Sequence, residues 1–179
     1  TTAQHVLDQL EDRIDFVLDG GPCRVGVEST VLQVEPGGLR LLRPGGTTVE
    51  EITAAFPEVA WLDPLTSPGD NLPQVAPGQL TQHYAPHTPL ELVDPTDLGD
   101  RVRDWSNRHP HTQLGLLRWR KTPCSREEPP GTKTYTEWLT TTGDWQEAAA
   151  RLFACLRQLD ESASELILAE RVPESGLGR

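Results

Sequence analysis

The chain has 179 residues, of which 36% are hydrophobic, and a formal net charge of −11 at pH 7. This length suits one full domain or two small ones, and no apolar run approaches the roughly 18 residues that a membrane-spanning helix needs. Because binding to nucleic-acid phosphates depends on clustered Lys and Arg and no segment is basic, we expect no direct binding of nucleic acid. The N-terminus lacks the features of a signal peptide, and three widely spaced cysteines predict reduced thiols in a cytoplasmic protein.

The first third of the chain predicts a small α/β unit. A helix is expected over residues 1–13, followed by a short apolar strand over 14–18. Two further strands, over 29–34 and 39–43, flank a Pro-Gly-Gly turn and predict a hairpin. The next helix, over 47–56, is expected to open on a capping box, in which a Thr is followed three residues later by a Glu.

Residues 64–89 differ in composition from the rest of the chain. The segment contains six prolines in 26 residues and no Lys or Arg. Because proline excludes a helix or a central strand, we expect an extended segment, either a plain linker or a functional loop. The segment divides the chain into a first unit over 1–63 and a second unit over 90–179.

The second unit alternates strands with helices. Strands are expected over 90–93, 114–117, 134–139 and 166–169, and helices over 96–108 and 144–160. This alternation predicts a small parallel sheet of βαβ type. The unit contains no glycine-rich phosphate-binding motif, so it offers no nucleotide fingerprint.

Three places in the chain carry side chains suited to binding. Ser29 and Thr30 place two hydroxyls at the start of a strand, although strand and turn formation alone also explains them. Arg43 lies at a strand end beside Pro-Gly, where its planar guanidinium suits a phosphate or a carboxylate; a surface salt bridge is the alternative. His83 and Tyr84 lie between prolines in the extended segment, where they either cover a ligand or dock on the domain surface.

These places belong to a series of motifs in a defined order. The series reads Thr-Thr-Ala-x-His-Val, Ile-x-x-Val-Leu-Asp-Gly-Gly, Val-Glu-Ser-Thr-Val, Leu-Arg-Pro-Gly and Pro-Gly-Gln-Leu-x-x-His-Tyr-Ala-Pro. It closely resembles the threonylcarbamoyl-AMP synthases of the YrdC family, in particular the long two-domain branch. The resemblance covers essentially the whole chain. It implies an incomplete YrdC-like α/β domain with a twisted mixed sheet, joined by an extended Pro-rich linker to a small Rossmann-like parallel α/β domain.

The resemblance also implies an activity. Members of this family are nucleotidyltransferases, L-threonylcarbamoyladenylate synthases, which convert ATP, L-threonine and bicarbonate into threonylcarbamoyl-AMP and pyrophosphate. Downstream threonylcarbamoyl-transfer proteins then use the adenylate to form N6-threonylcarbamoyladenosine (t6A) in tRNA. ATP enters as a substrate, and Mg²⁺ is expected with it. The chemistry depends on positioning and charge stabilisation, so no protein nucleophile is expected.

The resemblance assigns roles to individual residues. We expect Ser29 to hold L-threonine, with Thr30 beside it, and Arg43 to bind the ATP phosphates. Tyr84 and His83 are expected to lie over the nucleotide. No residue is assigned as catalytic or as a metal ligand.

Two motifs of the family, a basic Lys-x-Arg and a Ser-x-Asn, are expected upstream of Thr1, and relatives continue beyond Arg179 into a last helix. The chain is therefore expected to be the C-terminal portion of a longer enzyme, with little or no turnover and exposed apolar edges on its own. The alternative function is a non-catalytic regulatory or interaction module of the same fold. A relative that handles carbamoyl phosphate in hydrogenase maturation fits less well, because neither the linker nor the second domain is expected there.

Overall fold

The computed structural model describes residues 2–27, 29–62, 85–121, 132–173 and 176–178. The chain forms two compact units. The larger unit combines residues 1–26 with 86–172, and the smaller unit combines residues 27–85 with 173–179. Among the described residues, no helix is long and apolar enough to cross a membrane.

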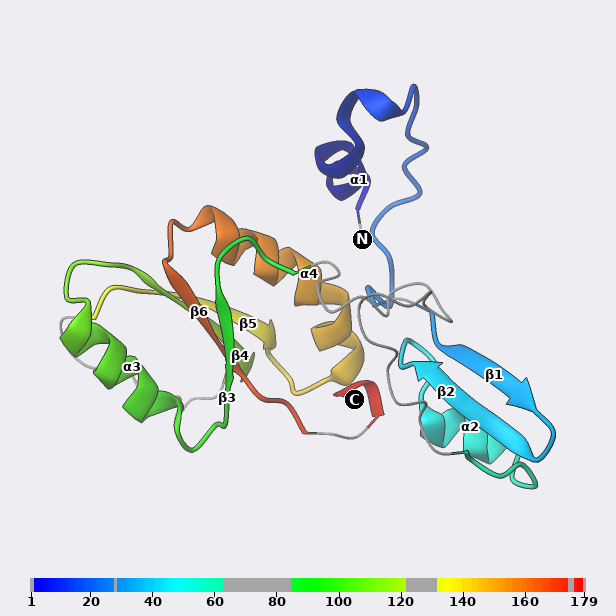
Figure 1. Ribbon diagram of the computed structural model, residues 1–179. Helices are drawn as coiled ribbons and strands as arrows, with labels where there is room; N and C mark the ends of the chain where they lie inside the picture. Colours follow the sequence, from blue (N-terminus) through cyan, green and yellow to red (C-terminus); the bar gives the residue numbers. More distant parts are fainter. Residues whose placement is uncertain (1, 28, 63–84, 122–131, 174–175, 179) are drawn as a thin grey trace, which may run out of the picture. The chain divides into compact units, whose positions relative to one another are not determined.

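A four-stranded sheet forms the centre of the larger unit (Figure 1). Its strands are β3 (Leu90–Val93), β4 (Leu114–Arg120), β5 (Thr134–Thr140) and β6 (Leu166–Glu170), in the spatial order β3-β6-β4-β5. Each neighbouring pair of strands is parallel. The predicted parallel sheet is therefore confirmed, and β6, the last strand in the chain, lies between β3 and β4.

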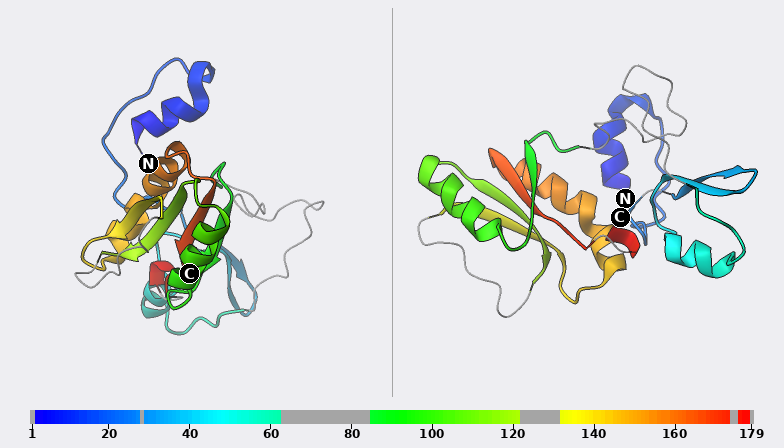
Figure 2. Two further views of the ribbon diagram at one scale, coloured as in Figure 1. Left: turned by 90° about the vertical axis from the view of Figure 1, so that its left-hand side faces the viewer. Right: turned by 60° about the horizontal axis from the view of Figure 1, so that its bottom comes forward.

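The helices α3 (Leu98–Arg108) and α4 (Trp145–Glu161) pack on opposite faces of this sheet (Figures 1 and 2). The buried cluster on the α3 face consists of Val93, Leu98, Val102, Leu114, Leu116 and Leu168. The buried cluster on the α4 face consists of Leu117, Leu139, Ala148, Cys155, Leu159, Ile167 and Ala169. Since both faces are covered, consecutive strand residues are buried in turn, which explains the nearly continuous apolar runs in β4 and β6.

The helix α4 agrees closely with its prediction. Asp144 caps it, because the carboxylate accepts hydrogen bonds from the backbone N–H groups of Gln146 (2.7 Å) and Glu147 (3.4 Å). The cap satisfies two of the donors that a helix N-terminus leaves without partners. The helix then presents Cys155 and Leu159, which are almost completely buried, to the sheet.

Two element boundaries in this unit differ from expectation. The helix α3 begins at Leu98 rather than at residue 96, because the backbone N–H groups of Asp97 and Leu98 both bond to the carbonyl of Asp94 and form a turn first. The strand β4 continues to Arg120, three residues past the expected end, because its pairing with β5 extends as far as Thr140. The expected end came too early because the last residues, Arg-Trp-Arg, are partly exposed and lack the apolar character of the buried first half of the strand.

The N-terminal helix α1 (Ala3–Leu10) ends in a 3₁₀ turn (Glu11–Arg13), as the expected helix over 1–13 approximately predicts. The predicted strand over 14–18 is wrong. Phe16 is 94% exposed and Leu18 fully exposed, and among the described residues no strand pairs with this segment. An apolar run becomes a strand only when its backbone groups find a partner, and apolar character alone does not supply one.

The smaller unit is built on an antiparallel hairpin of β1 (Val31–Glu35) and β2 (Gly38–Arg43), in which Val31 pairs with Arg43. An isolated parallel bridge joins Leu39 of β2 to Trp61, but the described sheet of this unit is the antiparallel pair β1 and β2, so the expected mixed sheet stays a prediction. Gly38 is required there, because a Cβ at this position would lie 2.2 Å from the carbonyl oxygen of Ala60.

The helix α2 (Val49–Ala55) of this unit opens on the expected capping box. Thr48 Oγ1 accepts a hydrogen bond from the Glu51 backbone N–H at 3.1 Å, and the Glu51 carboxylate accepts one from the Thr48 backbone N–H at 2.7 Å. Ile52 is the buried anchor of the helix. The fold is thus a mixed α/β arrangement with one parallel and one antiparallel sheet. The boundaries of the predicted linker at 64 and 89 stay a prediction, because most of that segment lies outside the described residues.

Candidate functional site

Ser29 and Arg43 are in direct contact at the open end of the hairpin. Arg43 is the last residue of β2, and its guanidinium turns back toward the segment that leads into β1. Its Nε and Nη2 donate hydrogen bonds to the Ser29 carbonyl oxygen, at 3.1 and 2.8 Å. The two residues that the sequence assigned to different substrates therefore lie side by side.

Thr30 connects this place to the start of α2. Its hydroxyl donates to the carbonyl oxygen of Thr47 at 2.6 Å and accepts from the Thr47 backbone N–H at 3.0 Å. A hydroxyl that both donates and accepts in this way fixes two chain segments against each other. The described contacts give Thr30 a positioning role, and its expected place beside L-threonine stays a prediction.

The Ser29 side chain is exposed, and its hydroxyl makes no hydrogen bond to any described residue. A hydroxyl can donate one hydrogen bond and accept two, so it suits the amino or carboxylate group of a small polar ligand. The guanidinium beside it supplies positive charge and planar donors for an oxyanion. Together they form a small candidate site, defined here as Ser29, Thr30, Arg43 and Thr47.

His83 and Tyr84, the remaining predicted site residues, lie outside the described residues. Thr47 was not predicted as a site residue, because the sequence placed it only at the start of the expected helix over 47–56. Its contribution to the candidate site is made by backbone atoms, for which the side chain gives no signal. The motif Leu-Arg-Pro-Gly indicated a binding role for Arg43 but not its contact with Ser29, because that contact joins residues 14 positions apart.

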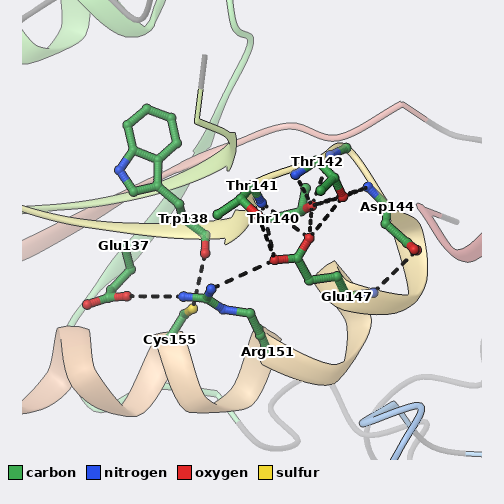
Figure 3. Close-up of polar contacts among 10 residues, drawn as sticks. Glu137, Trp138, Thr140, Thr141, Thr142, Asp144, Glu147, Arg151 and Cys155 are labelled. Atoms are coloured by element: carbon green, nitrogen blue, oxygen red, sulfur yellow. Dashed lines mark hydrogen bonds and ion pairs between the residues drawn. The ribbon is translucent and has the colours of Figure 1, made fainter. Parts of the chain in front are cut away.

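A second polar cluster occupies the turn between β5 and α4 in the larger unit (Figure 3). The Glu147 carboxylate accepts hydrogen bonds from the hydroxyl of Thr140, from the Thr141 backbone N–H (3.2 Å) and from the Thr142 hydroxyl (3.1 Å). These bonds, with the Thr140 hydroxyl first, lower the pKa of Glu147 to about 2. The carboxylate is already satisfied by the turn, so the cluster serves structure rather than ligand binding.

Cys155 lies about two helical turns further along α4 than Glu147 and is buried (Figure 3). Its thiol donates to the carbonyl of Trp138 over 3.8 Å, and burial raises the pKa of the thiol. A buried thiol with a raised pKa is a poor nucleophile. Cys23 is exposed and, like Cys155, is a free cysteine; Cys124 lies outside the described residues, so the reduced state of all three cysteines stays a prediction. Among the described residues, no group of three His, Cys, Asp or Glu side chains is arranged to hold a metal ion.

Two family models match the chain. The model described as "Threonylcarbamoyl-AMP synthase, C-terminal domain" matches residues 47–179, and the model described as "Telomere recombination" matches residues 1–45. The boundary between them falls two residues after Arg43, so the candidate site contains residues from both matched regions.

The chain is similar to curated proteins named threonylcarbamoyl-AMP synthase. It is 32% identical to the Bacillus subtilis protein over 182 residues and 33% identical to the Pyrococcus abyssi protein over 180 residues. These alignments cover 99% of this chain but 49% and 50% of the relatives. The Schizosaccharomyces pombe protein is 30% identical over 193 residues, and 46% of it is covered. The chain thus spans about half the length of the curated relatives it matches.

Solved structures give the same result. The crystal structure of P. abyssi Sua5 complexed with L-threonine matches with a TM-score of 0.77 and 29% identity, over 99% of this chain and 50% of that one. A second structure is of the same P. abyssi protein with an adjacent His and Tyr replaced by alanine. It matches with a TM-score of 0.77 and 28% identity, over 99% of this chain and 49% of that one.

Proposed function

The chain belongs to the threonylcarbamoyl-AMP synthase family, and from this membership we propose that it is the C-terminal part of an L-threonylcarbamoyladenylate synthase. The full-length protein would convert ATP, L-threonine and bicarbonate into threonylcarbamoyl-AMP and pyrophosphate. The product would supply the group that downstream transfer proteins attach to tRNA in t6A formation. The observation that carries this proposal is the contact between Arg43 and Ser29 in a chain of this family.

Ser29 is the proposed ligand of L-threonine. The P. abyssi relative has been solved in complex with this amino acid, which supports threonine binding in the family. In the present chain the Ser29 hydroxyl is exposed and makes no hydrogen bond to a described residue. It is therefore available to a polar ligand, while the bonds of Thr30 to Thr47 hold the backbone around it in place.

Arg43 is the proposed phosphate ligand. In the reaction, the amino group of L-threonine and bicarbonate form N-carboxy-threonine with loss of water. A carboxylate oxygen of this compound then forms a bond to the α-phosphorus of ATP while the bond to pyrophosphate breaks. Negative charge accumulates around the phosphorus in this step, and a positioned guanidinium stabilises it. Mg²⁺ is expected to enter with ATP, as is usual for nucleotide substrates.

His83 and Tyr84 are proposed to lie over the nucleotide. The chain contains one His-Tyr pair, at these positions, and a His-Tyr pair is what was replaced by alanine in one of the similar P. abyssi structures. A segment so rich in proline loses little conformational entropy when it is ordered over a ligand, which suits such a role.

The test of the proposed function uses the full-length protein from the native gene. Pyrophosphate release would be measured with each of ATP, L-threonine and bicarbonate omitted in turn. Replacing Arg43 by alanine is expected to lower kcat/KM for ATP by roughly a hundredfold or more, the usual cost of losing a charged donor at a reacting phosphate. Arg24→Ala is the matched control, because Arg24 is exposed and has no hydrogen bond or ion pair among the described residues.

An unchanged rate in Arg43→Ala would show that Arg43 is not a phosphate ligand. The non-catalytic alternative makes a different prediction. If the full-length protein binds a protein partner but forms no adenylate under any combination of substrates, the chain is an interaction module of this fold. The 179 residues alone are expected to show little or no turnover, because they span about half of each relative.

A further inference from the structure

The end of the parallel sheet carries an arginine whose polar contacts are incomplete. Arg118 lies in β4 on the α3 face, because it follows the buried residues Leu114 and Leu116 at strand spacing. Its side chain is only 18% exposed. Its Nε–H is fully enclosed and finds no hydrogen-bond acceptor in the described part of the chain. A buried donor without an acceptor is costly, so such a group calls for an explanation.

The neighbours of Arg118 contact its side chain, but none of the described ones accepts a hydrogen bond from its Nε–H. Across the sheet, Arg118 is paired with Trp138 of β5. The guanidinium carbon lies 4.7 Å from the centre of the Trp138 ring, a cation–π contact that fixes its position. On the other side, the nearest carboxylate oxygen, Oε2 of Glu170, is 3.9 Å from Nε, too far for a hydrogen bond. That oxygen already accepts a bond from the Trp119 backbone N–H at 3.0 Å.

A second cation lies next to it on the same face. Arg120 is exposed, and two residues along a strand are about 7 Å apart on one face. The Arg120 side chain passes over Gly143. A Cβ added at Gly143 would lie 3.0 Å from both Cδ and Nη1 of Arg120, so the absence of a side chain there leaves room for the arginine. Lys121 follows and is also exposed. Among the described residues, neither Arg120 nor Lys121 makes a side-chain ion pair.

This group differs from the arginines of the neighbouring helix α3. The arginines of α3 are paired with carboxylates: Arg101 with Glu91 and Asp104, Arg103 with Asp100, and Arg108 with Asp104. In a chain of net charge −11, Arg118, Arg120 and Lys121 lie together at the carboxyl end of one strand, and no carboxylate of the described residues lies within hydrogen-bond distance of their side-chain nitrogens. In open α/β sheets, ligands bind outside the carboxyl ends of the strands. Here β3 leads to α3 and β5 leads to α4, with β6 and β4 between them.

We propose that Arg118 and Arg120 form a binding site for a phosphate-bearing ligand at the carboxyl edge of the sheet in the larger unit. Two guanidinium groups on one face suit the multiple oxygens and the double charge of a phosphate or diphosphate better than the single charge of a carboxylate. The contact with Trp138 already restricts the Arg118 guanidinium, so the Arg118 side chain would lose little further conformational entropy when a phosphate binds. The proposal stands independently of the proposed function, since it uses no residue of the Ser29–Arg43 site.

The test is calorimetric titration of the 179-residue chain with inorganic pyrophosphate, at constant ionic strength. An Arg43→Ala background removes any contribution from the site in the smaller unit. We expect saturable binding that Arg118→Gln weakens at least about tenfold, since a charge-assisted hydrogen bond is lost. Arg103→Gln, which removes an exposed arginine already paired with Asp100, is the matched control and is expected to leave the affinity unchanged. Acetate is expected not to bind.

Glu170→Gln separates a ligand site from a structural ion pair. The amide oxygen can still accept from the Trp119 N–H, while the negative charge beside Arg118 is removed. A ligand site therefore predicts tighter pyrophosphate binding in Glu170→Gln, and this variant decides the question if Arg118→Gln fails to fold. Absence of saturable binding, equal affinity in Arg118→Gln, no gain in Glu170→Gln, or equally tight acetate binding would each overturn the proposal.

Discussion

The guanidinium of Arg43 is held against the carbonyl of Ser29, and this contact defines the candidate site at the scale of single residues. The motifs around both residues were readable in the sequence, and the resemblance assigned a role to each. Their contact was not predictable, because a side chain that reaches a backbone carbonyl 14 residues away leaves no trace in composition or spacing. The same applies to the two bonds between Thr30 and Thr47.

Glu147 supplies a prediction at this scale. Its pKa of about 2 lies well below the ordinary value of 4.5, chiefly through the hydrogen bond from the Thr140 hydroxyl. A carboxyl group whose pKa is lowered by folding stabilises the protein above its unfolded pKa, and that stabilisation is lost as the pH falls through the folded value. The Glu147 contribution is therefore complete above about pH 4.5 and lost toward pH 2.

We expect Glu147→Gln to lower the melting temperature at pH 7 and to reduce the further loss of stability between pH 5 and pH 2. Thermal melting followed by circular dichroism across this range measures both effects. Glu161→Gln, an exposed position at the end of the same helix, is the control. Parallel pH profiles for wild type and Glu147→Gln would show that the threonine contacts do not stabilise the turn.

The helices could be predicted from the sequence, because the patterns that indicate them lie within the helix itself. The helix α4 was predictable from the helical spacing of its apolar residues, and α2 from its capping box. The segment over 14–18 was predicted as a strand for its apolar residues, yet it has no paired strand among the described residues. Strand formation depends on a partner elsewhere in the chain, and local sequence does not reveal whether one is present.

Asp160, near the end of α4, binds the backbone just before β3, and this contact leads to a prediction. Its two carboxylate oxygens accept hydrogen bonds from the backbone N–H groups of His87 (3.0 Å) and Thr88 (2.9 Å), just before β3. Burial acts to raise the pKa of Asp160, but these bonds outweigh it and the pKa is lowered. The C-terminal end of α4 thus holds the chain at the point where it enters the sheet, a contact that joins residues more than 70 positions apart.

Replacing Asp160 by asparagine turns an acceptor into a donor that faces one of these N–H groups. We expect a loss of about 1–2 kcal/mol in the free energy of unfolding, the range for hydrogen bonds to a charged group at a partly exposed site. Amide hydrogen exchange should become faster at His87 and Thr88 but remain slow within β6. Uniform changes in exchange across the sheet would contradict a local role for Asp160.

At the scale of the whole molecule, the alternation of strands and helices in the second half of the chain correctly predicted a parallel sheet. The spatial order of its strands could not be read from the sequence, and it is this order that brings Glu170, Arg118 and Trp138 into one row. The family was indicated by five short motifs in a defined order. Each motif alone is unspecific, and the order becomes specific only when the whole chain is compared. The chain covers about half of each curated relative it matches, so the proposed activity is tested with the full-length protein.

The most direct test of the central claim is to incubate the full-length protein with ATP, L-threonine and bicarbonate and to analyse the products by mass spectrometry. We predict threonylcarbamoyl-AMP and an equal amount of pyrophosphate, both absent when any one substrate is omitted, and at most traces with the 179 residues alone. Adenylate formation that does not require L-threonine or bicarbonate, or no adenylate from a folded full-length protein, would contradict the proposed function.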